Sequence, residues 1–218
     1  GHQKIAEWLL GLCQTPEEKS AMLHAQNDDA FMRACMYGNL ELAKWLLCLC
    51  QTAEEQSAML HAKCDFAFCF TCKEGHQKIV ESLWGLCQTA EEKTAMLRAR
   101  DDMAFGFACE KGHLEIAKWL MGLCRTPEEQ LAMLHAGNDA AFRLACQKDH
   151  QEIVEWLFDL YETDVRLRLY KKHVKIPLLW HKLNEFEQIE IFNDQEWLIT
   201  TIKSNKSIKD VEALISAT

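Results

Sequence analysis

One segment of this chain recurs at a constant step of 37 residues. It reads GHQKIAEWLLGLC from Gly1, and close copies begin at Gly38, Gly75 and Gly112, with a fifth copy, DHQEIVEWLFDL, at Asp149. No insertion separates the copies. A unit this short cannot bury its apolar side chains alone, so neighbouring copies must stack on one another. The repeat therefore predicts a solenoid.

Each unit is predicted to contain three short helices, which makes the fold class all-α. In residues 28–38, Phe31, Ala34 and Cys35 share one helical face, and the following glycine ends that helix. Residues 39–49 have a second apolar face at Leu42, Trp45, Leu46 and Leu49. The third helix begins at a capping box with proline at the first helical position, as Thr15, Pro16 and Glu18 show. Three of its residues are predicted to face inward, namely Met22, Leu23 and Ala25.

These units resemble the ankyrin repeat. The segment GHLEIAKWL, 112–120, closely follows the second helix of the family, whereas residues 29–32 depart from its T-P-L-H motif. The resemblance covers residues 1–163 and implies an ankyrin-like helical repeat solenoid that binds another protein and is not an enzyme. Arrays of this divergent kind resemble those in effectors of intracellular bacteria and in giant viruses. This resemblance implies a cytoplasmic protein, in the host cytosol if it is a secreted effector.

Variation between the copies indicates where a partner would bind. Packing positions repeat, so first-helix positions that change from copy to copy are free of that constraint, including the position shared by Met32, Cys69, Gly106 and Arg143. In the ankyrin family the first helix lines the concave groove. The predicted partner-binding residues are Arg33, Met36, Tyr37, Phe70, Lys73, Glu74, Phe107, Glu110, Lys111, Arg143, Leu144 and Lys148. The alternative is that the two phenylalanines are buried between repeats.

The period ends after Thr163. Residues 164–218 are predicted to form a helical C-terminal cap or subdomain that covers the apolar end of the solenoid. This segment begins with a basic patch made of Arg166, Arg168, Lys171, Lys172 and Lys175. A plain solvated helix face is the favoured explanation of that patch, and binding of an acidic partner or a phosphate group is the alternative.

Composition excludes several classes of function. A net charge of −9 argues against nucleic-acid binding, and no apolar run approaches the length of a membrane span. Most of the 11 cysteines recur with the repeat, which indicates packing as reduced thiols. Cys64, Cys69 and Cys72 have a spacing that zinc ligands also use, but no second cysteine pair accompanies them. The sequence therefore predicts no metal and no cofactor.

No set of residues indicates catalysis. The histidines recur with the repeat, and no serine or cysteine stands in a triad pattern. The paired glutamates at each third helix suit its dipole, and a basic partner is the alternative reading. The chain starts at Gly1 rather than at a methionine, so we expect further sequence upstream. A second hypothesis is therefore the targeting region of a larger enzyme whose catalytic domain is absent here. A third is a scaffold that self-associates through an exposed solenoid end.

Overall fold

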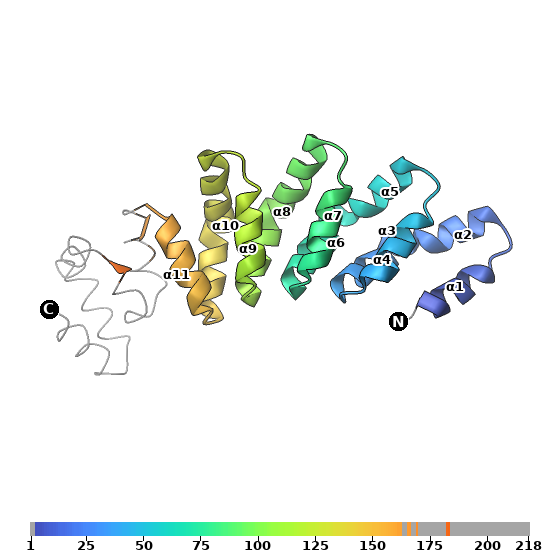
Figure 1. Cartoon of the computed structure of the whole chain (residues 1–218), viewed down its shortest axis with the longest axis horizontal. Coiled ribbons are helices and arrows are strands. Elements are labelled where there is room, and N and C mark those ends of the chain that lie inside the picture. The colour runs from blue at the N-terminus through green and yellow to red at the C-terminus, as the bar shows by residue number, and fades with distance from the viewer. Residues whose placement is uncertain (1–2, 163–164, 167–168, 170–181, 184–218) are drawn as a thin grey trace. The chain divides into compact units, whose positions relative to one another are not determined.

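A computed structural model describes residues 3–162, 165–166, 169 and 182–183 (Figure 1). These residues form helices and their connections, without any strand. The helices are α1 (Gln3–Gly11), α2 (Pro16–Leu23), α3 (Ala25–Met36), α4 (Leu40–Cys48), α5 (Ala53–Leu60), α6 (Ala62–Glu74), α7 (Gln77–Leu86), α8 (Ala90–Lys111), α9 (Leu114–Gly122), α10 (Pro127–Gln147) and α11 (Gln151–Leu160). The chain divides into two compact units, Gly1–Ala141 and Phe142–Thr218.

Within the first unit, the repeats stack as the sequence predicts. Helix α3 packs against α4 and α6, and α6 packs against α7 and α8 (Figure 1). Each repeat thus supplies one helix to a row made of α3, α6 and the second half of α8, which we call the first-helix row. The fold is an all-α repeat solenoid, which confirms the predicted fold class.

The core of the first unit follows the same step of 37 residues. Phe31, Phe68 and Phe105 are buried at equivalent places in the first-helix row, and the cysteines four residues later are fully buried. Burial of so many apolar side chains at each junction is the main stabilising contribution, because no repeat has a core of its own. The predicted inward face of this helix is confirmed.

One detail of the predicted core is wrong. Met22 is 43% exposed and Ala25 is exposed, although Met59 and Met96, the copies of Met22, are fully buried. Met59 and Met96 belong to repeats that have a described repeat on either side, whereas Met22 belongs to the first repeat of the described array. The sequence pattern treats all copies alike and therefore misses the difference.

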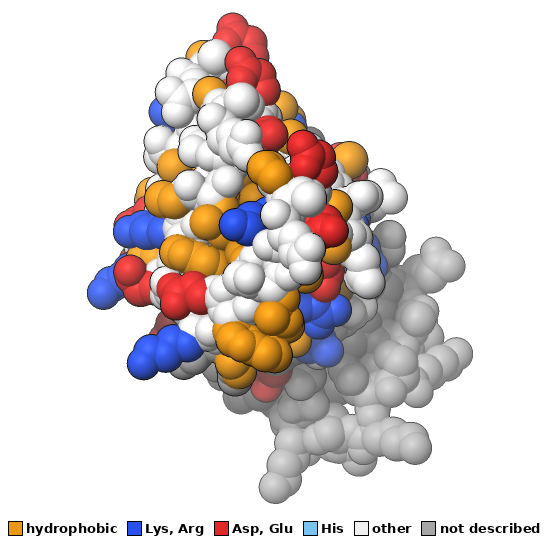
Figure 2. Space-filling model, turned by 90° about the vertical axis from the view of Figure 1, so that its right-hand side faces the viewer, with side chains coloured by type: hydrophobic (Ala, Val, Ile, Leu, Met, Phe, Trp, Pro, Cys, Tyr) orange, Lys and Arg blue, Asp and Glu red, His pale blue; other side chains and the backbone are white. Residues whose placement is uncertain are grey.

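Helix α1 has no buried residue, and its apolar side chains lie at the surface. Trp8, for example, is 63% exposed, and Figure 2, viewed from the α1 end, shows hydrophobic side chains gathered on this face. Self-association through such a face stays a prediction. None of the helices in the described part of the chain has the length and apolar character of a membrane span.

The third helix of each repeat starts at the predicted cap. The backbone N–H of Glu92 donates to Thr89 Oγ1 over 3.0 Å, and Glu92 Oε2 accepts from the N–H groups of Gln88 and Thr89 over 2.6 and 3.2 Å. Corresponding threonine caps begin α2 and α5. The second glutamate of each pair therefore accepts backbone N–H groups at the start of the third helix.

The cap makes stability depend on pH. Hydrogen bonds from the N–H of Gln88, and then from that of Thr89, lower the pKa of Glu92 from its ordinary 4.5. A lowered pKa contributes stability above the ordinary value, and that stability is lost as pH falls through the lowered value. We therefore expect Glu92→Gln to be less stable than wild type at neutral pH, with the difference shrinking in acid. Urea unfolding from about pH 6 to about pH 3 measures this.

Glu91→Gln is the matched control, because Glu91 in the same turn caps no N–H among the described residues. A Glu92→Gln profile that runs parallel to wild type at every pH would contradict this account of the cap.

Glycines end the first helices in left-handed geometry. Gly75 closes α6 with φ 80°, and Gly112 closes α8 with φ 83°. The ring of His113 from the next repeat lies against Gly75, and its Nε2 donates to the carbonyl of Lys73 over 3.0 Å. The glycine that ends the first helix of one repeat is thus in contact with the histidine of the next repeat.

Candidate partner-binding surface

Three phenylalanines lie together on the first-helix row. Phe66 and Phe70 of α6 are stacked with ring centroids 4.0 Å apart, and Phe107 of α8 meets Phe70 edge to face at 5.2 Å. All three rings are half-buried. The structure therefore brings together Phe70 and Phe107, two of the predicted partner-binding residues, and adds Phe66, which the sequence pattern did not indicate.

Two cations cover these rings. Lys73 Nζ lies 5.3 Å from the centroid of Phe70 and 4.3 Å from that of Phe107. The guanidinium of Arg100 lies 5.5 Å from the centroid of Phe66 and donates to the carbonyl of Lys63 over 2.8 Å. We call Phe66, Phe70, Lys73, Arg100 and Phe107 the aromatic patch. Cation–π contacts hold it in a preformed arrangement.

The other predicted partner-binding residues are also accessible. Arg33 is exposed and bonds to Asp29, and Tyr37 is exposed where α3 ends. None of the predicted set is buried: Met36, Glu110, Arg143 and Leu144 are half-buried, and Glu74, Lys111 and Lys148 are exposed. Arg143, Leu144 and Lys148 belong to the second unit, whereas the aromatic patch belongs to the first.

One of the variable first-helix positions does not face solvent in every copy. Met32 and Cys69 are buried, whereas Gly106 and Arg143, at the equivalent position, are half-buried. The residues that differ at this position are therefore packed in the core in the copies with Met32 and Cys69, and they are partly accessible only in the other two. Variation in sequence at this position does not by itself mark a binding residue.

The cysteines at Cys64, Cys69 and Cys72 do not form a ligand cluster among the described residues. Cys64 is exposed, while Cys69 and Cys72 are fully buried. Burial raises the pKa of the Cys69 thiol to about 12 and that of Cys72 well above its ordinary value. These two thiols are therefore protonated packing residues.

A recurring pair of side chains, histidine or arginine with aspartate, lies at the turn before each first helix. Three successive residues there are left-handed: Gln26, Asn27 and Asp28; Lys63, Cys64 and Asp65; Arg100, Asp101 and Asp102; and Gly137, Asn138 and Asp139. The last aspartate pairs with the residue four positions earlier, as in His61–Asp65 at 2.6 Å and Arg98–Asp102 at 2.9 Å. Asparagine and aspartate tolerate this geometry better than most residues. The pair holds the turn between the third helix and the next first helix.

Sequence reasoning missed this pair. The signal was present, because Arg98 replaces histidine in one copy while the aspartate four residues later stays constant. Burial raises the pKa of Asp102, and the charge of Arg98 opposes that shift. A hydrogen-bond donor at this position is thus needed beside a buried carboxylate.

Only Arg166 of the predicted basic patch lies in the described part of the chain. Its guanidinium covers the ring of Phe158 at 4.8 Å and donates to the carbonyl of Lys182. Arg168, Lys171, Lys172 and Lys175 lie outside the described residues, as does most of the predicted C-terminal cap at 164–218.

Comparisons with known proteins agree with this architecture. Residues 31–121 match a family model described as ankyrin repeats, in three copies. A solved structure of an ankyrin repeat family protein from Legionella pneumophila is similar with a TM-score of 0.57 and 25% sequence identity. The match covers 86% of this chain and 52% of that one, so this chain spans about half the length of its structural neighbour. No curated protein sequence shows significant similarity.

Proposed function

We propose, from the premise that this chain is a divergent member of the ankyrin-repeat family, that it binds another protein through the aromatic patch. Ankyrin repeats generally mediate protein–protein interaction and are typically not enzymes, which supports this reading. The observation that carries the proposal is the half-exposed Phe70–Lys73–Phe107 arrangement on the first-helix row.

The chemistry of the patch suits a protein partner. Aromatic residues, phenylalanine included, and arginine are enriched at protein–protein interfaces. The rings are already held by neighbouring cations, so little ordering is needed on binding. Lys73 and Arg100 favour a partner that presents an apolar side chain beside an acidic group.

The proposal includes a location. Similarity to a Legionella ankyrin-repeat protein supports an effector that acts in the cytosol of a host cell. Fractionation of infected cells tests this: recovery in host cytosol supports it, and retention inside the bacterium contradicts it.

A charge reversal at the centre of the patch tests the binding surface. Lys73→Glu removes the cation shared by Phe70 and Phe107 and places a carboxylate near the ring faces. With a partner captured by the wild-type chain and then purified, we expect Kd to rise about tenfold or more, which corresponds to about 1.4 kcal/mol. Titration calorimetry measures it.

Lys78→Glu is the matched control, because Lys78 is exposed on α7 in the second helix of the same repeat. The control keeps the wild-type Kd on this account. Weaker binding by Lys78→Glu, with Lys73→Glu unchanged, would move the interface to the second helices.

A further inference from the structure

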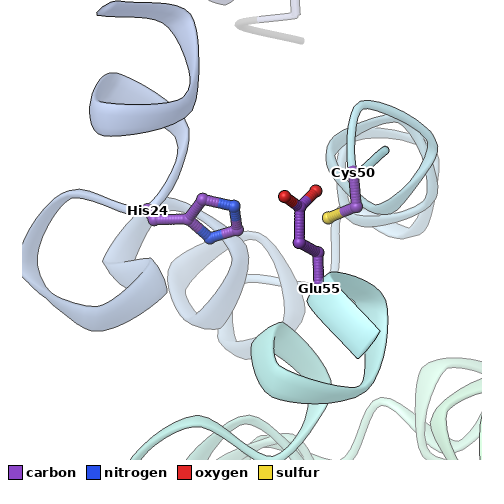
Figure 3. Close-up of side chains that lie close together, drawn as sticks. All are labelled: His24, Cys50 and Glu55. Atoms are coloured by element: carbon purple, nitrogen blue, oxygen red, sulfur yellow. The ribbon is translucent and has the colours of Figure 1, made fainter. Parts of the chain in front are cut away.

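Three potential metal ligands converge at the junction of the first two repeats. His24 follows α2, Cys50 follows α4, and Glu55 lies in the first turn of α5. One ligand atom from each lies within 4.8 Å of the others, and Figure 3 shows the three side chains facing one another. Within the described part of the chain, this is the one group of three such residues at that spacing.

The hydrogen bonds of His24 and Glu55 to neighbouring residues leave one nitrogen and one oxygen available to bind a metal ion. Nδ1 of His24 lies 2.6 Å from Asp28 Oδ1 and donates its proton there, so Nε2 is the nitrogen that can ligate. Metal-binding histidines are commonly oriented by a carboxylate in this way. Glu55 Oε2 accepts the N–H of Gln51 over 2.6 Å, so Oε1 is the oxygen that can ligate.

The site also has access and space. His24 and Glu55 line a cavity of about 500 Å³ whose walls include Leu10, Leu23 and Trp45. The third residue of the group, Cys50, is buried. A fourth ligand, such as water, can therefore reach the ion from the cavity.

Other copies show what histidine adds at this position. In the third copy, Arg98 bonds to Asp102 and also to the carbonyl of Glu129, so its donors are used by the protein. In the second copy, Nε2 of His61 is buried, and no described residue gives it a hydrogen bond. In that copy Ser57 Oγ donates to Glu92 Oε1 over 3.4 Å, so the oxygen that corresponds to Glu55 Oε1 is already used, and the described residues there form no such group of three ligands.

We propose that His24 Nε2, Cys50 Sγ and Glu55 Oε1 bind one Zn²⁺ ion, with water as the fourth ligand. A nitrogen, sulfur and oxygen donor set with a tetrahedral ion is typical of zinc. The Cys50 thiol loses its proton to solvent on binding, so affinity falls as pH falls. The ion joins the first repeat to the second. This site departs from the expectation, drawn from the sequence, that the chain holds no metal.

Zinc titration of the reduced full chain, in competition with a chromophoric chelator, tests the site. We expect His24→Arg to bind one equivalent of Zn²⁺ fewer than wild type, and Asp28→Asn to weaken that equivalent about 10–100-fold. The arginine variant keeps the ion pair with Asp28, because Arg98 forms the same pair in the third copy. Cys48→Ser is the control, since Cys48 is exposed and lies outside the cluster.

Co²⁺ gives a second readout. Thiolate-to-cobalt absorption should appear with wild type and with Cys48→Ser. With Cys50→Ser, the absorbance that the one cobalt–Cys50 bond contributes should be lost. Equal zinc binding by wild type and a folded His24→Arg variant would overturn the proposal, as would an unchanged cobalt spectrum with Cys50→Ser.

Discussion

Gly75→Ala should destabilise the solenoid by about 3 kcal/mol. Gly75 has φ 80°, a left-handed geometry that costs an alanine about 1–2 kcal/mol. A Cβ there would also lie 2.5 Å from Cε1 of His113. Moving that ring weakens its hydrogen bond to the carbonyl of Lys73, which is worth about 1 kcal/mol. Equilibrium urea unfolding followed by circular dichroism measures the change.

A second glycine provides the matched control. Gly85 lies in α7, and a Cβ there meets no heavy atom within 4 Å. Gly85→Ala should leave stability unchanged or raise it by up to about 1 kcal/mol. Equal stability of the two alanine variants would contradict the role assigned to the Gly75–His113 contact.

A double-mutant cycle separates the two causes of the Gly75 effect. His113→Ala removes the clash and leaves the left-handed backbone, so Gly75→Ala in that background should cost only about 1–2 kcal/mol. The same cost in both backgrounds would show that the ring contact contributes nothing.

Most of the fold could be predicted from the sequence, because repetition and helix chemistry are local signals. The constant step fixed the stacking, the threonine and glutamate pairs marked where α2, α5 and α8 begin, and Phe31 marked the buried face. The left-handed turn at Gln26–Asp28 was missed, although its last aspartate recurs at the 37-residue step, because three residues in this conformation show no alternation of apolar and polar side chains that would mark them. Met22 was misplaced because burial depends on the neighbouring repeat.

The candidate surface was predicted only in part. Variation between copies pointed to Phe70 and Phe107, but not to Phe66 and Arg100, which complete the patch through contacts made in three dimensions. A scan for aromatic residues four apart on one helix would have found Phe66 beside Phe70. The contact between Arg100 and Phe66 depends on the left-handed turn, so no sequence pattern indicated it.

The second large effect concerns binding. Phe70→Ala/Phe107→Ala should weaken binding of the partner about 100-fold or more, because two aromatic anchors that each contribute about 1.4 kcal/mol or more give that factor together. The two rings are half-buried, unlike Phe105, which is almost fully buried in the core. We therefore expect the double variant to remain helical, whereas Phe105→Ala should lose about 3–5 kcal/mol of stability.

Trp8→Ala is the control for loss of a large aromatic side chain, because Trp8 is exposed on α1 and lies outside the aromatic patch. Its Kd should equal that of wild type.

The measurement that tests the central claim most directly is the Kd of the purified partner for Phe70→Ala/Phe107→Ala, with circular dichroism of the same samples. Our account predicts a rise of about 100-fold or more with helical content and unfolding midpoint close to wild type. A wild-type Kd in a folded double variant would contradict binding through the aromatic patch. Loss of helical content would show instead that the two phenylalanines are core residues.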